Sequence, residues 1–261
     1  MYTRITVIEQ AILGARWVQK RVKMKSRNHA ATKYLLTLGS VVLILGSMSW
    51  AKDQTDIDKR IGKAAEVLNE IMAVPDKAIP DKVMTHAKCI AVIPSLVKIA
   101  VGFGGQHGKG VATCRTEHGW SAPAPITITG GSWGLQLGGQ AVDLVMIVKS
   151  DTGMQKMLSS KFKLGADASA AAGPVGRDAA ADTDIKMNAE VLTYSRARGL
   201  FAGIDLNGAV ISQDKDETAL LYGKFIPFED LLSGKVPPPP SAEPFLAAVR
   251  KYSHEVHERQ G

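Results

Sequence analysis

The spacing of hydrophobic residues changes character along the chain. Residues 56–73 carry hydrophobic side chains at helical intervals, with charged residues between them, which predicts an amphipathic helix that Pro75 ends. Further helices are predicted over 81–87, 152–160, 217–222 and 242–259.

Short runs rich in Val, Ile and Gly fill the middle of the chain and predict strands. These runs cover 88–94, 99–104, 110–115, 124–129, 134–138, 142–148, 189–196, 198–205 and 209–213, and 166–175 is expected to be extended. Turns are predicted at 105–108, 117–119, 130–131 and Asn207-Gly208. No helix-length connection separates most runs, so the strands should pair antiparallel. We therefore predict an α+β fold: a mainly antiparallel sheet, curled into a barrel or sandwich, with the N- and C-terminal helices packed outside.

The first 51 residues have the three zones of a secretory signal. A basic stretch precedes an apolar run at 34–46, and Ser49-Trp50-Ala51 places small residues at the cleavage positions. We expect a signal peptide over 1–51 and a single mature domain over 52–261. The alternative is an uncleaved membrane anchor. The basic zone is long, so translation starts at either Met1 or Met24.

The net charge of +7 belongs to this leader. Residues 1–51 hold eight of the 32 basic residues and one of the 25 acidic ones, which leaves 24 of each in the remainder. A domain without net charge gives no argument for nucleic-acid binding.

Cys89 and Cys114 are the only cysteines, and both follow the leader. Export would place them in an oxidising compartment, and they lie in neighbouring predicted strands. A disulfide between them is one interpretation, and two buried free thiols are the other.

Motifs for catalysis and metal binding are incomplete. Residues 130–134 match G-x-S-x-G around Ser132, but a nucleophile elbow needs a following helix, and 135–139 form a poor one. His254 and His257 are three residues apart and lack a third ligand nearby. A glycine-rich hairpin and a solvated helix face explain these residues better, so we expect no enzyme, no metal and no cofactor.

Basic residues mixed with aromatic ones suit a membrane surface, because cations attract lipid headgroups. The candidates are Lys59, Arg60 and Lys63 on the first helix, and Lys161, Lys163 and Arg177 later in the chain. Scattered surface charge is the alternative. The first helix also carries acidic residues, and an ordinary role in core packing explains its apolar stripe better than membrane contact does.

Four segments of the chain have a distinctive sequence: residues 87–94 (AKCIAVIP), 108–148 (GKGVATCRTEHGWSAPAPITITGGSWGLQLGGQAVDLVMIV), 159–177 (SSKFKLGADASAAAGPVGR) and 194–211 (YSRARGLFAGIDLNGAVI). These four segments resemble the SYLF domain family. Several motifs in the right order, within about residues 55–235, make the resemblance specific.

The resemblance implies non-enzymatic lipid binding. Eukaryotic members of the family bind phosphoinositides and, in fungi, actin filaments. This chain resembles the stand-alone, exported bacterial form, so we expect an anionic phospholipid or membrane surface of the periplasm or cell envelope as the partner, rather than actin. The competing hypothesis is a structural or protein-interaction domain without intrinsic lipid affinity.

Overall fold

A computed structural model describes residues 54–74, 78–101, 103–133, 138–175, 189–197, 200–202 and 206–253. The predicted leader, Arg177 and the two histidines at 254 and 257 lie outside the described residues. The chain divides into two compact units between Asp53 and Gln54. The second unit holds both hydrophobic cores described below, so it contains the interactions that it needs to fold as a domain.

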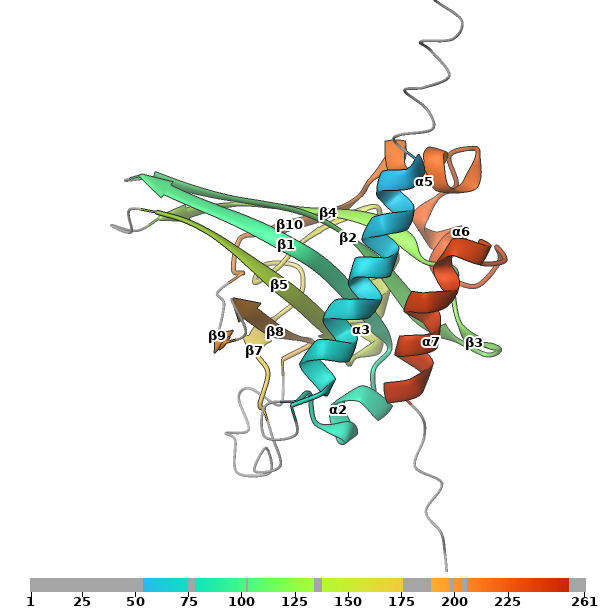
Figure 1. The fold of residues 1–261 in the computed structure, drawn as a ribbon, viewed down its shortest axis with the longest axis horizontal. Coiled ribbons are helices and arrows are strands. Elements are labelled where there is room, and N and C mark those ends of the chain that lie inside the picture. Colours follow the sequence, from blue (N-terminus) through green and yellow to red (C-terminus); the bar gives the residue numbers. More distant parts are fainter. Residues whose placement is uncertain are drawn as a thin grey trace, which may run out of the picture. The chain divides into compact units, whose positions relative to one another are not determined.

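A ten-stranded sheet organises the second unit. Its main path runs β6-β10-β4-β2-β1-β5-β8-β7, and β3 and β9 pair with β2 and β8. Only the β7–β8 pair is parallel among the described strands. The strands are β1 (Cys89–Val101), β2 (Phe103–Thr116), β3 (Gly119–Trp120), β4 (Ala124–Trp133), β5 (Gly138–Val148), β6 (Lys161–Lys163), β7 (Ala170–Ala172), β8 (Val191–Ala197), β9 (Leu200–Ala202) and β10 (Val210–Gln213). This curled, mainly antiparallel sheet with flanking helices confirms the predicted α+β fold (Figure 1).

The four longest strands correct the predicted turns. Residues 105–108 lie inside β2 and 130–131 inside β4, and Gly105 and Gln106 pair with Gly131 and Gly130 across the two strands. Glycine suits a chain reversal, but it also allows two strands or a neighbouring side chain to approach the backbone closely, and Gly108 has this second role. A Cβ on Gly108 would lie 2.7 Å from Ile93 Cγ2. The predicted strand at 99–104 was also wrong, because β1 continues to Val101 and the chain reverses before Phe103.

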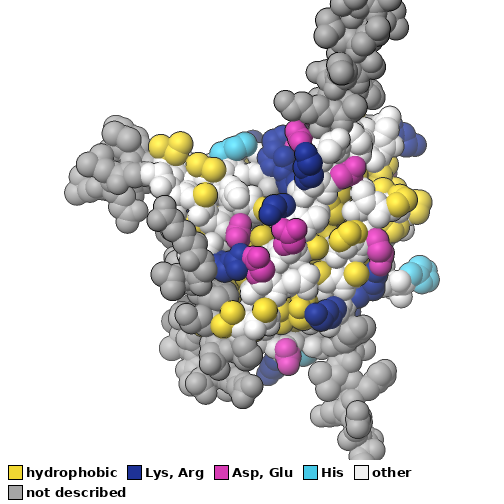
Figure 2. All heavy atoms as spheres, viewed as in Figure 1, with side chains coloured by type: hydrophobic (Ala, Val, Ile, Leu, Met, Phe, Trp, Pro, Cys, Tyr) yellow, Lys and Arg dark blue, Asp and Glu magenta, His cyan; other side chains and the backbone are white. Residues whose placement is uncertain are grey.

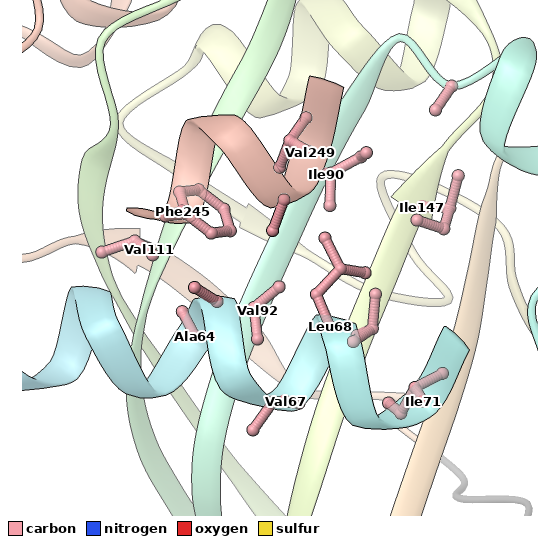
Figure 3. Close-up of a cluster of buried hydrophobic side chains, with 14 of the residues drawn as sticks. Ala64, Val67, Leu68, Ile71, Ile90, Val92, Val111, Ile147, Phe245 and Val249 are labelled. Carbon is pink, nitrogen blue, oxygen red and sulfur yellow. The ribbon is translucent and has the colours of Figure 1, made fainter. Parts of the chain in front are cut away.

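Helices cover one face of the sheet. Helix 54–72, shown blue to cyan in Figure 1, lies there with α2 (Asp81–Thr85) and α7 (Glu243–Tyr252). The apolar stripe of helix 54–72 is buried: Ile61 and Leu68 are fully inaccessible to solvent. In Figure 3, Leu68 points from the helix towards Ile90, with Val249 of α7 beside it. The first helix therefore packs against the core, which is the role that its mixture of basic and acidic residues favoured over membrane contact.

The opposite, concave face carries a second core. Alternate residues of the same strands point there, among them Ile93, Ile126 and Leu144. The helices α3 (Asp151–Leu158) and α6 (Phe228–Leu232) contribute side chains to this core. α5 (Lys215–Tyr222) follows β10, and a short 3-10 turn, η2 (Pro240–Ala242), leads into α7.

Candidate functional site

The lysines of helix 54–72 are exposed but lie beside acids. Lys59 lies 3.8 Å from Asp56, and Lys63 donates a 2.9 Å hydrogen bond to Glu66. The hydrogen bond to Glu66 raises the pKa of Lys63 above its ordinary value. Each positive charge on this helix face is thus offset one turn away, which leaves little net attraction for an anionic surface.

Arg60 belongs to a different environment. Its Nη1 lies 2.5 Å from Glu217 Oε2, and Lys109 Nζ lies 3.0 Å from Glu217 Oε1 and 2.8 Å from Asp214 Oδ2. Both acids are buried. This cluster connects helix 54–72, β2 and α5, so we assign Arg60 a role in holding the helix on the sheet.

The pKa values of this cluster follow from two opposed effects. Burial alone would lower the pKa of Lys109, but its hydrogen bonds to Asp214 and Glu217 outweigh burial and raise it. Burial likewise would raise the pKa of Asp214, but hydrogen bonds from Lys109 and the Glu217 backbone lower it. Lys109 and Asp214 are therefore held in their charged forms.

Lys161 and Lys163 differ from the other candidates. They are exposed at alternate positions of β6, with Phe162 buried between them. Neither side chain forms an ion pair within the described part of the chain, and Lys156, on the preceding helix α3, is also exposed. Residues 156–163 hold these three lysines and no acid, and Asp167, four residues after Lys163, accepts a 2.7 Å hydrogen bond from the Lys163 backbone N–H. This edge of the sheet therefore carries more positive than negative charge.

The sheet register places Lys163 in a row with residues far away in the sequence. Lys163 pairs with Val210, Val210 with Thr129, and Thr129 with His107. His107 pairs in turn with Val97. Paired residues of neighbouring strands point to the same face. Lys163, Thr129, His107 and Val97 are exposed, and Val210 is half-buried, so the row forms one surface strip.

Together with Val97, His107 and Thr129 of this strip, the outer parts of β1, β2, β4 and β5 form what we call the open end of the sheet, the described residues 97–101, 103–108, 128–133 and 138–142. Ile99 is 59% exposed there and Val97 41%. The helix-side core contacts β1 and β2 at Val92 and Val111 and includes no residue of the open end. Figure 2 shows hydrophobic atoms at this end of the sheet, apart from the charged side chains over the helix.

Sequence reasoning missed this exposed face. The predicted turn at 105–108 separated Val97 and Ile99 from the strand that pairs with them. The signal that could have found them is alternation: Val97, Ile99 and Val101 follow a period of two beside lysine and alanine.

The two cysteines are joined. Cys89 and Cys114 are directly opposite on β1 and β2, and their sulfur atoms form a disulfide. Both residues are buried in the concave core. The bond pins the register of the sheet at the end of β1 and β2 that lies away from the open end.

The arrangement offers little for catalysis or metal binding. Ser132 lies within β4, and the next described element is β5, so the strand-turn-helix of a nucleophile elbow is missing from the described residues. Among the described side chains, no group of three His, Cys, Asp or Glu residues has the geometry of a metal site. Within the described ranges, no helix is both long enough and apolar enough to cross a membrane.

The chain is similar to proteins of known families. Residues 129–252 match the family Ysc84, described as "Las17-binding protein actin regulator". The chain is 34% identical over 206 residues to "SH3 domain-containing YSC84-like protein 1" of Rattus norvegicus and 32% identical to its Homo sapiens counterpart. It is also 34% identical over 208 residues to "Protein YSC84" of Saccharomyces cerevisiae. None of these names describes an enzyme.

These matches cover most of this chain but less of each relative. The rat and human alignments span 76% of this chain and 60% of the relative, and the yeast alignment spans 75% of this chain and 44% of the relative.

Proposed function

Because the chain belongs to the SYLF family, also called Ysc84, we propose that its folded domain binds the headgroups of anionic phospholipids at a membrane surface without catalysing a reaction. The observation that carries the proposal is that Lys161 and Lys163 are both exposed on β6 and form no ion pair in the described part of the chain. A lysine near an anionic membrane contributes about 1 kcal/mol of attraction. Two or three lysines therefore supply a weak, reversible contact that depends on salt.

Lys161 and Lys163 form a better site than the lysines of helix 54–72. A carboxylate one helical turn away opposes each lysine of the helix, at Asp56 and Glu66. The apolar stripe of the helix is also occupied by the core, so the helix has no hydrophobic face to offer to lipid. Lys161 and Lys163 are exposed on an edge strand, and the carboxylate nearest to them along the described part of the chain, Asp167, bonds to the Lys163 backbone rather than to either ammonium group.

Vesicle flotation of residues 52–261 tests the proposal. The protein should float with vesicles of phosphatidylcholine and phosphatidylglycerol, and not with phosphatidylcholine alone. Binding should fall as salt rises, because screening at physiological ionic strength acts over about 8 Å. Failure to bind the anionic vesicles at low salt would refute the proposed function.

Two double variants locate the charge contact. Lys161→Glu with Lys163→Glu should abolish flotation at physiological salt without lowering the melting temperature. Lys59→Glu with Lys63→Glu makes the same change of charge on helix 54–72 and should bind nearly as well as the wild type. The opposite pattern would move the site to the helix.

The place of action follows from the leader. We propose that the signal over 1–51 is cleaved after Ala51 and that the domain acts in the periplasm or cell envelope. N-terminal sequencing of the exported protein should begin at Lys52. If the protein is recovered from the membrane fraction with residues 1–51 intact, the leader is an uncleaved membrane anchor instead.

A second candidate function is a protein-interaction domain. The description of the matched family as Las17-binding favours it. The flotation assay separates the two functions. An interaction domain without lipid affinity would stay at the bottom of the gradient at every lipid composition.

A further inference from the structure

We propose that the open end of the sheet, the described residues 97–101, 103–108, 128–133 and 138–142, inserts into the membrane surface while Lys163 contacts the headgroups. This inference rests on the proposed function and adds to it the surface and the orientation of binding. The charge contact alone leaves the orientation of the domain undefined, whereas an apolar end beside a basic strip defines one.

The composition of the open end suits a lipid surface. Its sequence contains no Asp or Glu, and Lys98 and His107 are its only residues with ionisable side chains of basic character. Carboxylates are repelled by anionic headgroups and are costly to bury in hydrocarbon, so their absence from both segments removes the main obstacle to insertion. An anionic membrane is the occupant that offers hydrocarbon for the exposed Val97 and Ile99 and negative charge for the basic residues behind them.

Exposed hydrophobic residues gather on one face of this end. Val97 and Ile99 alternate with Lys98, so both point to the face that helix 54–72 covers farther along the strands. The positions that pair with Ile99 are Gly105 and Gly139, which have no side chain to cover it. Ile99 therefore projects from a flat surface of backbone.

The register also places aromatic positions at the extreme end. Val101 pairs with Phe103, and Phe103 pairs with Trp133, so these three positions are adjacent where the strands end. Aromatic residues are enriched at the boundary between lipid and water. The positions thus follow the order that a membrane requires, with aromatic positions at the end and basic residues behind.

The spacing along the strands matches the depth of an interface. Ile99 lies two residues and Val101 four residues beyond the row of Val97 and Lys163, or about 7 Å and about 13 Å at 3.3 Å per residue. Apolar surfaces of peripheral proteins enter the boundary of headgroups and acyl chains by about 5–10 Å. Insertion to the level of Ile99 would bring Lys163 to the headgroups.

Variants of residues 52–261 in the flotation assay test the inference. Val97→Asp with Ile99→Asp should weaken binding to anionic vesicles by about tenfold or more, because the exposed apolar area is lost to lipid and two charges are added. Val97→Thr with Ile99→Thr keeps β-branched residues in the strand and should weaken binding by about fivefold. Val74→Asp is the matched control, since Val74 is 43% exposed at the end of helix 54–72, and it should bind like the wild type.

Three outcomes separate the claims. If the wild type fails to bind, the proposed function falls, and this inference falls with it. If the wild type binds and both double variants bind equally well, the function stands and the inference is overturned. If the double variants change the oligomeric state in sedimentation rather than the binding, the open end contacts a second copy of the chain, and the inference is also overturned.

Tryptophan fluorescence gives an independent readout. Residues 52–261 contain only Trp120 and Trp133. Trp120 lies at the other end of β2, about 40 Å away along the strand, where its Nε1 donates a 3.0 Å hydrogen bond to Ser253 Oγ. With Trp120→Phe, anionic vesicles should shift the remaining emission to shorter wavelength. With Trp133→Phe they should not, and a shift in this second variant alone would overturn the inference.

Discussion

Leu68→Ala tests whether helix 54–72 is part of the core. Leu68 is fully buried and faces Ile90 across the interface between helix and sheet (Figure 3). The substitution removes about three carbons, which at about 0.8 kcal/mol for each costs roughly 2.4 kcal/mol in transfer free energy. The cavity left in a close-packed interface adds to this, so the total loss should be about 3–4 kcal/mol.

Urea unfolding followed by circular dichroism measures this loss. Val74→Ala is the control, because Val74 lies just beyond the same helix and is half-exposed, and it should change stability by less than about 0.5 kcal/mol. Folded Leu68→Ala protein should bind anionic vesicles like the wild type. A loss below about 1 kcal/mol, or weaker vesicle binding with the fold intact, would contradict the assignment of this helix to the core.

Other regions yield further predictions. Cys89→Ser with Cys114→Ser should lower the free energy of unfolding by about 3 kcal/mol, because the disulfide closes a loop of 25 residues; equal stability of the variant and the wild type in urea would count against the bond. The pKa of Asp214 is lowered from 3.8 in the folded protein, so its contribution to stability should be present above that pH and lost as the pH falls through the folded value. Asp214→Asn should therefore make stability fall less steeply with decreasing pH. An unchanged acid limb in the variant would contradict this role of Asp214. Ser132→Ala should leave vesicle binding and melting temperature nearly unchanged, whereas loss of a hydrolytic activity present in the wild type would restore the nucleophile-elbow interpretation.

Local patterns predicted the elements whose causes are local. The helical spacing from Ile57 to Ile71 is visible within one window, and the observed helix at 54–72 differs from the predicted one by two residues at its start and one at its end. α6 (Phe228–Leu232) was missed because five residues are too few to show a period. The glycines at 105–108 were misread because glycine marks both turns and close approaches between strands.

The candidate surface could not be predicted because it depends on register. Lys163 and Val97 lie 66 positions apart and share a row only through three intervening strands. No local pattern encodes that row. The pairing of Arg60 with Glu217, which separates it from the exposed lysines, likewise joins positions that are 157 residues apart. The candidate lysines and Arg60 can be listed from the sequence, but the fold is needed to separate the paired Arg60 from the exposed lysines.

Hydrogen exchange with and without anionic vesicles tests the central claim most directly, because it reports where the domain meets the membrane without any substitution. We predict slower exchange on vesicle binding at the amides of residues 99–105 and 131–140 and around Lys163, with helix 54–72 unchanged. Protection of helix 54–72 with no change at the open end of the sheet would contradict the account.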